Sequence, residues 1–352
     1  MFGFLKRKKA ADPPTPAPAA ADPLLDAAQR GDPEAQCSLG EKYYYGRDIE
    51  KDQAQAVMWY QKAAEQGHAP AQLHLGWCLQ HGLGTRQDHA QAAAWYQKAA
   101  EQGEPSAVNN LAWLYQKGYG VPQNYAEALR LFKKAAEEGV VPAMYSVGVF
   151  YRNGYGTKKD PEEAVRWFIK AAEMGDRKAQ YHLGVCYEKG VGTERDPEEA
   201  ARWYRKAAEQ GSPGAQFSLG YCYDKGLGVE QDRAEAGLWY RKAAEQGHIS
   251  AAANLAYLHY YGFGVEENDA EAFRLWKIAA EAGNINAQEN LAFCYEDGVG
   301  TDKNLTEAEK WYAIAAEGRR ERARKDPTRT KEQKDMEEML AGLRRMLRMN
   351  HD

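Results

Sequence analysis

A glycine recurs every 36 residues along most of this chain, without insertions, at Gly31, Gly67, Gly103, Gly139, Gly175, Gly211, Gly247 and Gly283. Such self-similarity is typical of a solenoid, in which each unit can bury its apolar face only against its neighbours. The 352 residues are therefore predicted to form one elongated repeat domain. A solenoid presents a long continuous surface, so we expect an extended binding face rather than one enclosed pocket.

Each repeat carries the pattern of two helices joined by a glycine loop. Counted from the repeat glycine, position four is Ala, position eight is Leu or Val, and position twelve is usually Tyr. This spacing places the three positions on one helical face, and we expect them in the core. Small residues at positions four and nine let the second helix approach closely. Loop glycines such as Gly82 and Gly84 are expected to end the first helix and reverse the chain.

The second helix has a start signal in all eight repeats: Asp or Asn, followed three residues later by Gln or Glu, as in Asp52 with Gln55. This spacing predicts a capping box, in which the side chain of each of the two residues accepts a hydrogen bond from the backbone N–H of the other. An aromatic pair and then Ala-Ala follow downstream. In the pair Trp203 and Tyr204, we expect Trp203 to be a core aromatic residue.

The full pattern is Ala-x3-Leu-Gly-x2-Tyr-x2-Gly-x-Gly-Val/Thr-x2-Asp-x3-Ala-x2-Trp-Tyr/Phe-x-Lys-Ala-Ala, almost unbroken from Ala179 to Ala208. It resembles the Sel-one-like repeat, a branch of the tetratricopeptide superfamily, over 288 of the 352 residues. The resemblance implies an all-α, right-handed α/α superhelical solenoid of eight helix-loop-helix repeats that acts as an adaptor or scaffold, often in bacteria. Some cysteine-rich relatives carry a disulfide in each repeat, but this chain has at most one Cys per repeat.

The first repeat departs from the others at three positions. Glu41 and Lys42 stand where the other repeats have aromatic, aliphatic or Cys residues, and Asp48 replaces the second loop glycine. Terminal repeats need a polar outer face. The first repeat is therefore predicted to be the N-terminal cap.

A row of aromatic residues lies on the first-helix face that points away from the predicted core. At 100° per residue, positions six and ten lie roughly opposite positions four, eight and twelve. Two interpretations are open: the row packs between repeats, or it lines a concave groove that binds a partner peptide or protein through aromatic anchors. The row comprises Trp77, Trp113, Tyr145, Tyr181, Phe217, Tyr221, Tyr257 and Phe293.

Position seven, beside this row, is polar in every repeat. In the related tetratricopeptide groove, asparagine at the matching position commonly holds the ligand backbone. The resemblance lends this role to Asn110, Asn254 and Asn290. Local hydrogen bonding to loop carbonyls is the alternative.

The sequence predicts neither a metal site nor a catalytic one. His74, Cys78 and His81 stand at i, i+4 and i+7 and are zinc-binding residue types. Other repeats have Cys, Leu or Phe at the position of Cys78, which favours packing. Motifs for nucleophilic hydrolysis, zinc proteolysis and phosphate binding are missing. We expect no cofactor and no enzymatic activity, with lactam hydrolysis, ascribed to some cysteine-rich relatives, as a distant alternative.

Charge and cysteine usage bear on partners and location. The net charge is −5, and both ends of the chain are basic, so the repeats are acidic and are not expected to bind nucleic acid. Four of the five cysteines share one repeat position, and neighbouring copies should lie ~10 Å apart, too far for a disulfide. Reduced thiols favour a cytoplasmic location. The sequence has no run of 18 apolar residues.

The segments outside the repeats have their own predicted roles. Residues 1–9 form a basic and apolar tip, for which an unstructured solvated tail is favoured over weak peripheral contact with the inner membrane face. Residues 10–23 form a Pro/Ala-rich disordered linker. Residues 24–318 form the solenoid. Residues 319–352 form a basic segment and an amphipathic helix that caps the last repeat, or else binds a partner. A membrane-proximal scaffold recognised through these tails is the alternative function.

Overall fold

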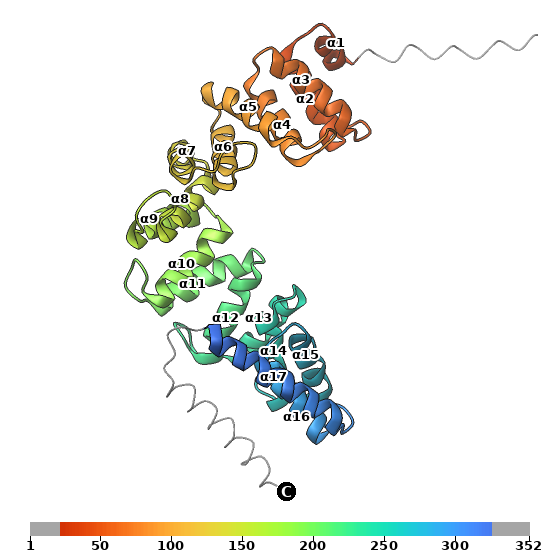
Figure 1. Cartoon of the computed structure of the whole chain (residues 1–352), viewed down its shortest axis with the longest axis vertical. Coiled ribbons are helices and arrows are strands. Elements are labelled where there is room, and N and C mark those ends of the chain that lie inside the picture. The colour runs from red at the N-terminus through yellow and green to blue at the C-terminus, as the bar shows by residue number, and fades with distance from the viewer. Residues whose placement is uncertain (1–21, 326–352) are drawn as a thin grey trace, which may run out of the picture. The chain divides into compact units, whose positions relative to one another are not determined.

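A computed structural model describes residues 22–325, and in this range the chain forms seventeen α-helices and no β-strand (Figure 1). The predicted all-α solenoid of eight helix-loop-helix repeats is confirmed. The proposed membrane-contacting tip, most of the linker and the C-terminal amphipathic helix lie outside the described residues. The helices are α1 (Pro23–Gln29), α2 (Pro33–Tyr45), α3 (Gln53–Glu65), α4 (Ala69–His81), α5 (His89–Glu101), α6 (Pro105–Lys117), α7 (Tyr125–Glu137), α8 (Val141–Asn153), α9 (Pro161–Glu173), α10 (Arg177–Lys189), α11 (Pro197–Glu209), α12 (Pro213–Lys225), α13 (Arg233–Glu245), α14 (Ile249–Tyr261), α15 (Asp269–Glu281), α16 (Ile285–Asp297) and α17 (Leu305–Lys325).

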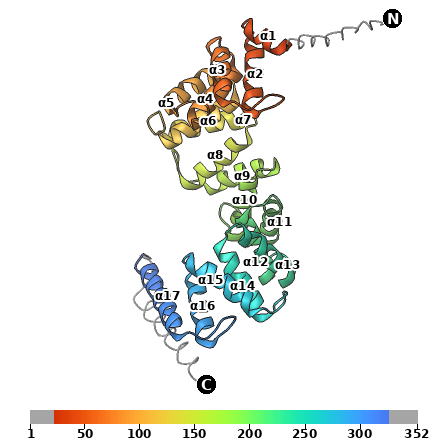
Figure 2. The same ribbon diagram turned by 90° about the vertical axis from the view of Figure 1, so that its right-hand side faces the viewer.

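The helices belong to two compact units, which we call unit 1 (α1–α8, up to residue 159) and unit 2 (α9–α17, from residue 160). Within each unit, every helix packs against the next helix along the chain (Figures 1 and 2). Even-numbered helices from α2 to α16 are the first helices of the repeats, and odd-numbered helices from α3 to α17 are the second helices. The boundary between the units falls inside the fourth repeat, between α8 and α9.

In every repeat after the first, the loop between the two helices contains a glycine at a position that leaves no room for a Cβ atom. Gly84 has φ +68°, and a Cβ atom at this position would overlap the backbone carbonyl of Gln53 at the start of α3. The equivalent residue of the first repeat is Asp48, which keeps a positive φ of 62° and is exposed. Within residues 22–325 no second helix precedes this loop, and the Asp48 side chain is exposed.

The predicted helix starts are confirmed, but the capping box is only half formed. Each cap side chain accepts a hydrogen bond three residues on, as Asp196 Oδ1 does from the Glu199 N–H at 3.0 Å. The second hydrogen bond of the box, from the cap N–H to the Glu199 carboxylate, is not formed. The Asp196 N–H donates instead to the Tyr187 carbonyl of the preceding helix at 2.9 Å. Glu199 is therefore free to pair with Arg202 one turn later, at 2.6 Å.

The core of each repeat differs from the prediction in two details. Position eight is buried throughout, as expected, but the tyrosines at position twelve, such as Tyr187, are only half-buried. The expectation that Trp203 is a core residue is wrong, because its indole is half-buried and the Lys206 ammonium lies over the ring, 4.0 Å from the centroid. The second aromatic residue of the pair, Tyr204, fills the core and is 1% exposed.

Helix α1 packs against the first helix of the first repeat, as each second helix packs against the first helix of the next repeat. Ala28 of α1 is buried in a cluster with Ala35, Leu39 and Trp59, and Leu24 packs on the edge of this cluster. The polar first repeat therefore has a helical cover on one side.

Paired glutamines inside four of the repeats were not predicted. Gln72 at position five is buried; its Nε2 donates to the Ala64 carbonyl at 3.1 Å, and its Oε1 accepts from Gln102 at 2.8 Å. The bonds join the ends of two second helices to the first helix between them. The same arrangement occurs in the repeats that contain the pairs Gln36–Gln66, Gln180–Gln210 and Gln216–Gln246.

In the repeats without a glutamine pair, position five and the residue thirty positions later both differ from glutamine, with one exception. Where position five is apolar, at Val108, Met144 and Ala252, the residue thirty positions later is Glu138, Met174 or Ala282. Gln288 is the exception, because Gly318 takes the place of its partner, and its buried Oε1 has no hydrogen-bond partner within residues 22–325. A glutamine at one position thus predicts a glutamine at the other.

All five cysteines are buried, and the structure gives no disulfide between them. Among residues 22–325, no helix is both long enough and apolar enough to cross a membrane.

Candidate partner-binding face

The predicted aromatic row falls on the first helices, and position ten is its most exposed part. Trp77, Tyr221 and Tyr257 are 40%, 40% and 45% exposed, whereas the core ring of Tyr96 is fully buried. Trp113 and Phe293, at the same repeat position, are half-buried. We call this side of the even-numbered helices the first-helix face.

Local contacts fix the exposed rings without covering them. The Trp77 indole N–H donates to the Tyr44 hydroxyl of the preceding repeat at 3.3 Å, and the ring lies 4.0 Å from His81. Tyr257 packs against Tyr261, with ring centroids 4.6 Å apart. Pre-ordered aromatic rings lose little conformational freedom when a partner covers them.

The position-six residues Tyr145, Tyr181 and Phe217 are half-buried. Phe217 stacks on His248 of the next repeat at a centroid distance of 4.6 Å, and the ring of Tyr181 lies against Gly214 of the following repeat. Phe293, at position ten, makes a similar contact with Tyr260 of the repeat before it, at 5.9 Å. These rings help to join neighbouring repeats, so the row divides into packing residues and exposed residues.

The asparagines at position seven lie beside the exposed rings. Asn110, Asn254 and Asn290 are all half-buried. Asn110 Oδ1 accepts a bond from Asn109 at 3.2 Å, and Asn110 lies next to the hydroxyl of the core residue Tyr96. The structure thus gives Asn110 local polar neighbours while leaving part of its amide at the surface.

Two cavities lie on the first-helix face, one in each unit. The cavity in unit 1 has a volume of about 190 Å³ and is lined by Tyr44, His74, Trp77, Ser106 and Asn110, from the first helices of three successive repeats. The cavity in unit 2 has a volume of about 210 Å³, and Phe217, Tyr221 and Leu227 contribute to its wall. Both are smaller than the ~300 Å³ at which small-molecule sites begin. Their size suits single side chains of a partner.

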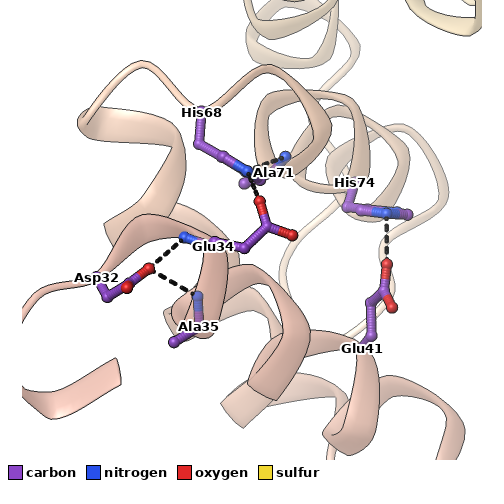
Figure 3. Close-up of polar contacts among 7 residues, drawn as sticks. All are labelled: Asp32, Glu34, Ala35, Glu41, His68, Ala71 and His74. Carbon is purple, nitrogen blue, oxygen red and sulfur yellow. Dashed lines mark hydrogen bonds and ion pairs between the residues drawn. The ribbon is translucent and has the colours of Figure 1, made fainter. Parts of the chain in front are cut away.

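His74 does not join Cys78 and His81 in a metal cluster within the described residues. Its Nε2 atom instead lies 3.2 Å from the Glu41 carboxylate of the preceding repeat, and its ring stacks on Tyr60 (Figure 3). Burial lowers the pKa of His74, which keeps its ring neutral. The sequence analysis noted Glu41 and His74 separately but did not pair them.

A second histidine joins the same two repeats. The His68 Nδ1 accepts from the Ala71 N–H at 3.3 Å, so the ring proton belongs on Nε2, which lies 2.9 Å from the Glu34 carboxylate (Figure 3). A neutral ring with this tautomer satisfies both contacts. His68 therefore caps α4 and also binds the start of α2.

Comparison with known proteins identifies the repeat. Eight contiguous segments match the Sel1 repeat, at residues 33–68, 69–104, 105–140, 141–176, 177–212, 213–248, 249–284 and 285–318. Among solved structures, a protective antigen of uropathogenic Escherichia coli with an SLR fold is 38% identical over 84% of this chain, with a TM-score of 0.79. The aligned part spans only 63% of that protein. A comparison with curated proteins gives no match.

A second solved structure, a Sel1 repeat protein from Oxalobacter formigenes, is 30% identical with a TM-score of 0.63. The similarity covers 84% of this chain and 86% of that protein. The likeness therefore extends over nearly the whole length of a relative, not only over isolated repeats.

Proposed function

Because the chain belongs to the Sel1-repeat family, we propose that it is a non-enzymatic adaptor or scaffold that binds a partner protein or peptide on its first-helix face. Sel1-repeat proteins generally mediate protein–protein interactions, and their fold is typically a non-catalytic interaction scaffold. Our proposal adds to this general role that the partner binds on the first-helix face.

One observation carries the proposal: exposed aromatic rings recur at one repeat position, beside cavities that suit single side chains. Trp77 borders the cavity of unit 1, and Tyr221 that of unit 2. Aromatic residues in partly closed pockets are typical interaction hot spots. Asn110 adds a polar group to the cavity of unit 1, where it suits a partner backbone.

The class and location of the partner are part of the proposal. The acidic repeats favour a protein over a nucleic acid, because nucleic-acid binding needs a basic surface. Five buried cysteines without a disulfide favour a cytoplasmic location, where cysteines stay reduced. Contact with a membrane would rest on residues 1–9, which lie outside the described residues.

The test is capture of partners from native lysate with the wild-type chain and with Trp77→Ala, Tyr221→Ala and Tyr257→Ala. Leu238→Ala is the matched control, since Leu238 is 54% exposed but lies on the second helix α13. We expect a protein that the wild type and the control retain and that the face variants lose. Equal retention by all variants would place the binding surface elsewhere.

A further inference from the structure

Three potential metal ligands from the first two repeats converge on one point. Cys37 and Glu41 lie one turn apart on α2, and His74 lies on the neighbouring first helix α4. One ligand atom from each, the thiol sulfur, a carboxylate oxygen and a ring nitrogen, lie within 4.8 Å of one another. Within residues 22–325, this is the single group of three or more such side chains with that spacing.

The separations are close to those of a coordination sphere. Zinc holds sulfur at ~2.3 Å and nitrogen or oxygen at ~2.0–2.2 Å in a tetrahedron, which sets ligand atoms about 3.3–3.6 Å apart. The His74 and Glu41 atoms are already 3.2 Å apart. The longest separation would have to close by about 1 Å, a change within reach of side-chain rotation.

We propose that Cys37, Glu41 and His74 form a zinc site with three protein ligands and a fourth position open to water or to a partner group. A thiolate, an imidazole and a carboxylate are the ligand types that zinc uses, whereas Mg²⁺ and Ca²⁺ prefer oxygen atoms alone. The site joins α2 to α4, so the ion would tie the first repeat to the second.

Burial favours the ligand form of His74 and opposes that of Cys37. Burial lowers the pKa of His74, which keeps the imidazole neutral and able to bind. Burial, with the nearby Glu41 and Glu34 carboxylates, raises the pKa of the Cys37 thiol to about 12. The thiol proton must therefore leave when zinc binds, as it does in other thiolate sites.

The sequence singles out this pair of repeats. Cysteine occupies position six in the first repeat alone, and Glu41 is the one acidic residue at position ten, where the other repeats are aromatic or Val. A polar cap accounts for a carboxylate there, but not for a buried thiol beside it. His182 has the same repeat position as His74 without these neighbours, because position six of the repeat before it is Tyr145 and position ten is Val149.

The experiment is zinc titration calorimetry on the full, reduced chain without a histidine tag. We expect one zinc ion per chain, and at least tenfold weaker binding in Cys37→Ala, Glu41→Gln and His74→Asn. His182→Asn and Cys222→Ala are the matched controls and should bind as the wild type does. Cobalt adds a second readout, since a thiolate-to-metal absorption band should appear in the wild type and vanish in Cys37→Ala.

Thermal unfolding of each variant without metal separates a lost ligand from a lost fold. Zinc should raise the melting temperature of the wild type and of the controls, and leave that of the ligand variants nearly unchanged. The proposal is overturned if the folded wild type takes up no zinc at micromolar concentration, or if folded Glu41→Gln and His74→Asn bind zinc as tightly as the controls.

Discussion

Units 1 and 2 use the same helical scaffold to present different chemistry on the first-helix face. In unit 1 the cavity wall contains the imidazole of His74, the amide of Asn110 and the hydroxyl of Tyr44. In unit 2 the cavity wall contains the rings of Phe217 and Tyr221 together with the charged side chains of Glu188 and Arg195. Repeats that are nearly interchangeable in backbone are therefore not interchangeable in surface, and each unit is suited to a different feature of a partner.

The largest expected effect tests whether the two units really share their backbone. Gly84→Ala in unit 1 and Gly228→Ala in unit 2 both place a Cβ atom against a backbone carbonyl at positive φ. We expect each change to lower the free energy of unfolding by about 3 kcal/mol or more, because the backbone cannot yield as a side chain can. Urea unfolding measures the loss.

Asp48→Gly, at the equivalent position of the first repeat, is the contrast and should be nearly neutral, since Asp48 is exposed. A large loss in one unit only would show that the two loops are not equivalent.

A smaller effect is expected on the affinity for a partner, and it compares the first-helix face of unit 1 with that of unit 2. Trp77→Ala and Tyr221→Ala should each weaken binding of a partner by ~2 kcal/mol, a factor of about thirty, if the partner contacts both units. Titration of the purified partner measures the two losses, with thermal unfolding as the check that both variants remain folded. Loss from one variant alone would assign the partner to that unit.

The next contrast lies in the core, at tyrosines that share one repeat position. The Tyr96 hydroxyl in unit 1 donates to Gln80 at 2.9 Å, whereas the Tyr240 hydroxyl in unit 2 lies beside the Asn254 amide and makes no well-formed hydrogen bond among the described residues. Tyr96→Phe should therefore cost about 1 kcal/mol of stability, and Tyr240→Phe should cost less. Urea unfolding of the two variants decides this, and equal losses would contradict it.

The smallest expected effect is on the pH dependence of stability. His248 caps α14 by accepting from the Ala251 N–H at 3.2 Å, and burial lowers its pKa. As the pH falls below about 6.5, His248 is protonated in the unfolded chain before it is protonated in the folded chain. The stability that the neutral His248 cap contributes is therefore lost between that pH and the lower pKa of the folded state. His248→Asn keeps a cap that does not titrate.

Thermal unfolding between about pH 7.5 and 5.5 should show a shallower acid loss in His248→Asn than in the wild type. Parallel slopes for wild type and His248→Asn would rule out this role.

The sequence predicted features that depend on neighbouring residues better than features that depend on contacts between helices. The start at Asp196 and the left-handed glycine end of α10 at Gly190 follow from residues within one turn, and both were predicted. The half-buried state of Trp203 was not predicted. The helical period shows which way a side chain points, but not how completely neighbouring helices cover it. The glutamine pairs were visible only by comparing positions thirty residues apart.

The candidate site was predicted at the level of a helix face. Position ten was identified from the 100° rule, and Tyr257 is exposed as that rule indicates. Phe217 lies on the same side but packs on His248, since position six is closer to the next repeat. The approach of Cys37 and Glu41 to His74 depends on how two repeats stack, which no motif within one repeat records.

The buried glutamine pairs suggest where this chain can gain or lose sequence during evolution. Both members of a pair lie within one segment of 36 residues, so duplication or deletion of a whole segment carries both amides together. A crossover between Gln72 and Gln102, joining a glutamine repeat to an apolar one, would bury an amide without its partner at a cost of about 1–3 kcal/mol. Recombination is therefore expected to preserve repeat boundaries, and a chimaera designed from this chain should be cut at the same places.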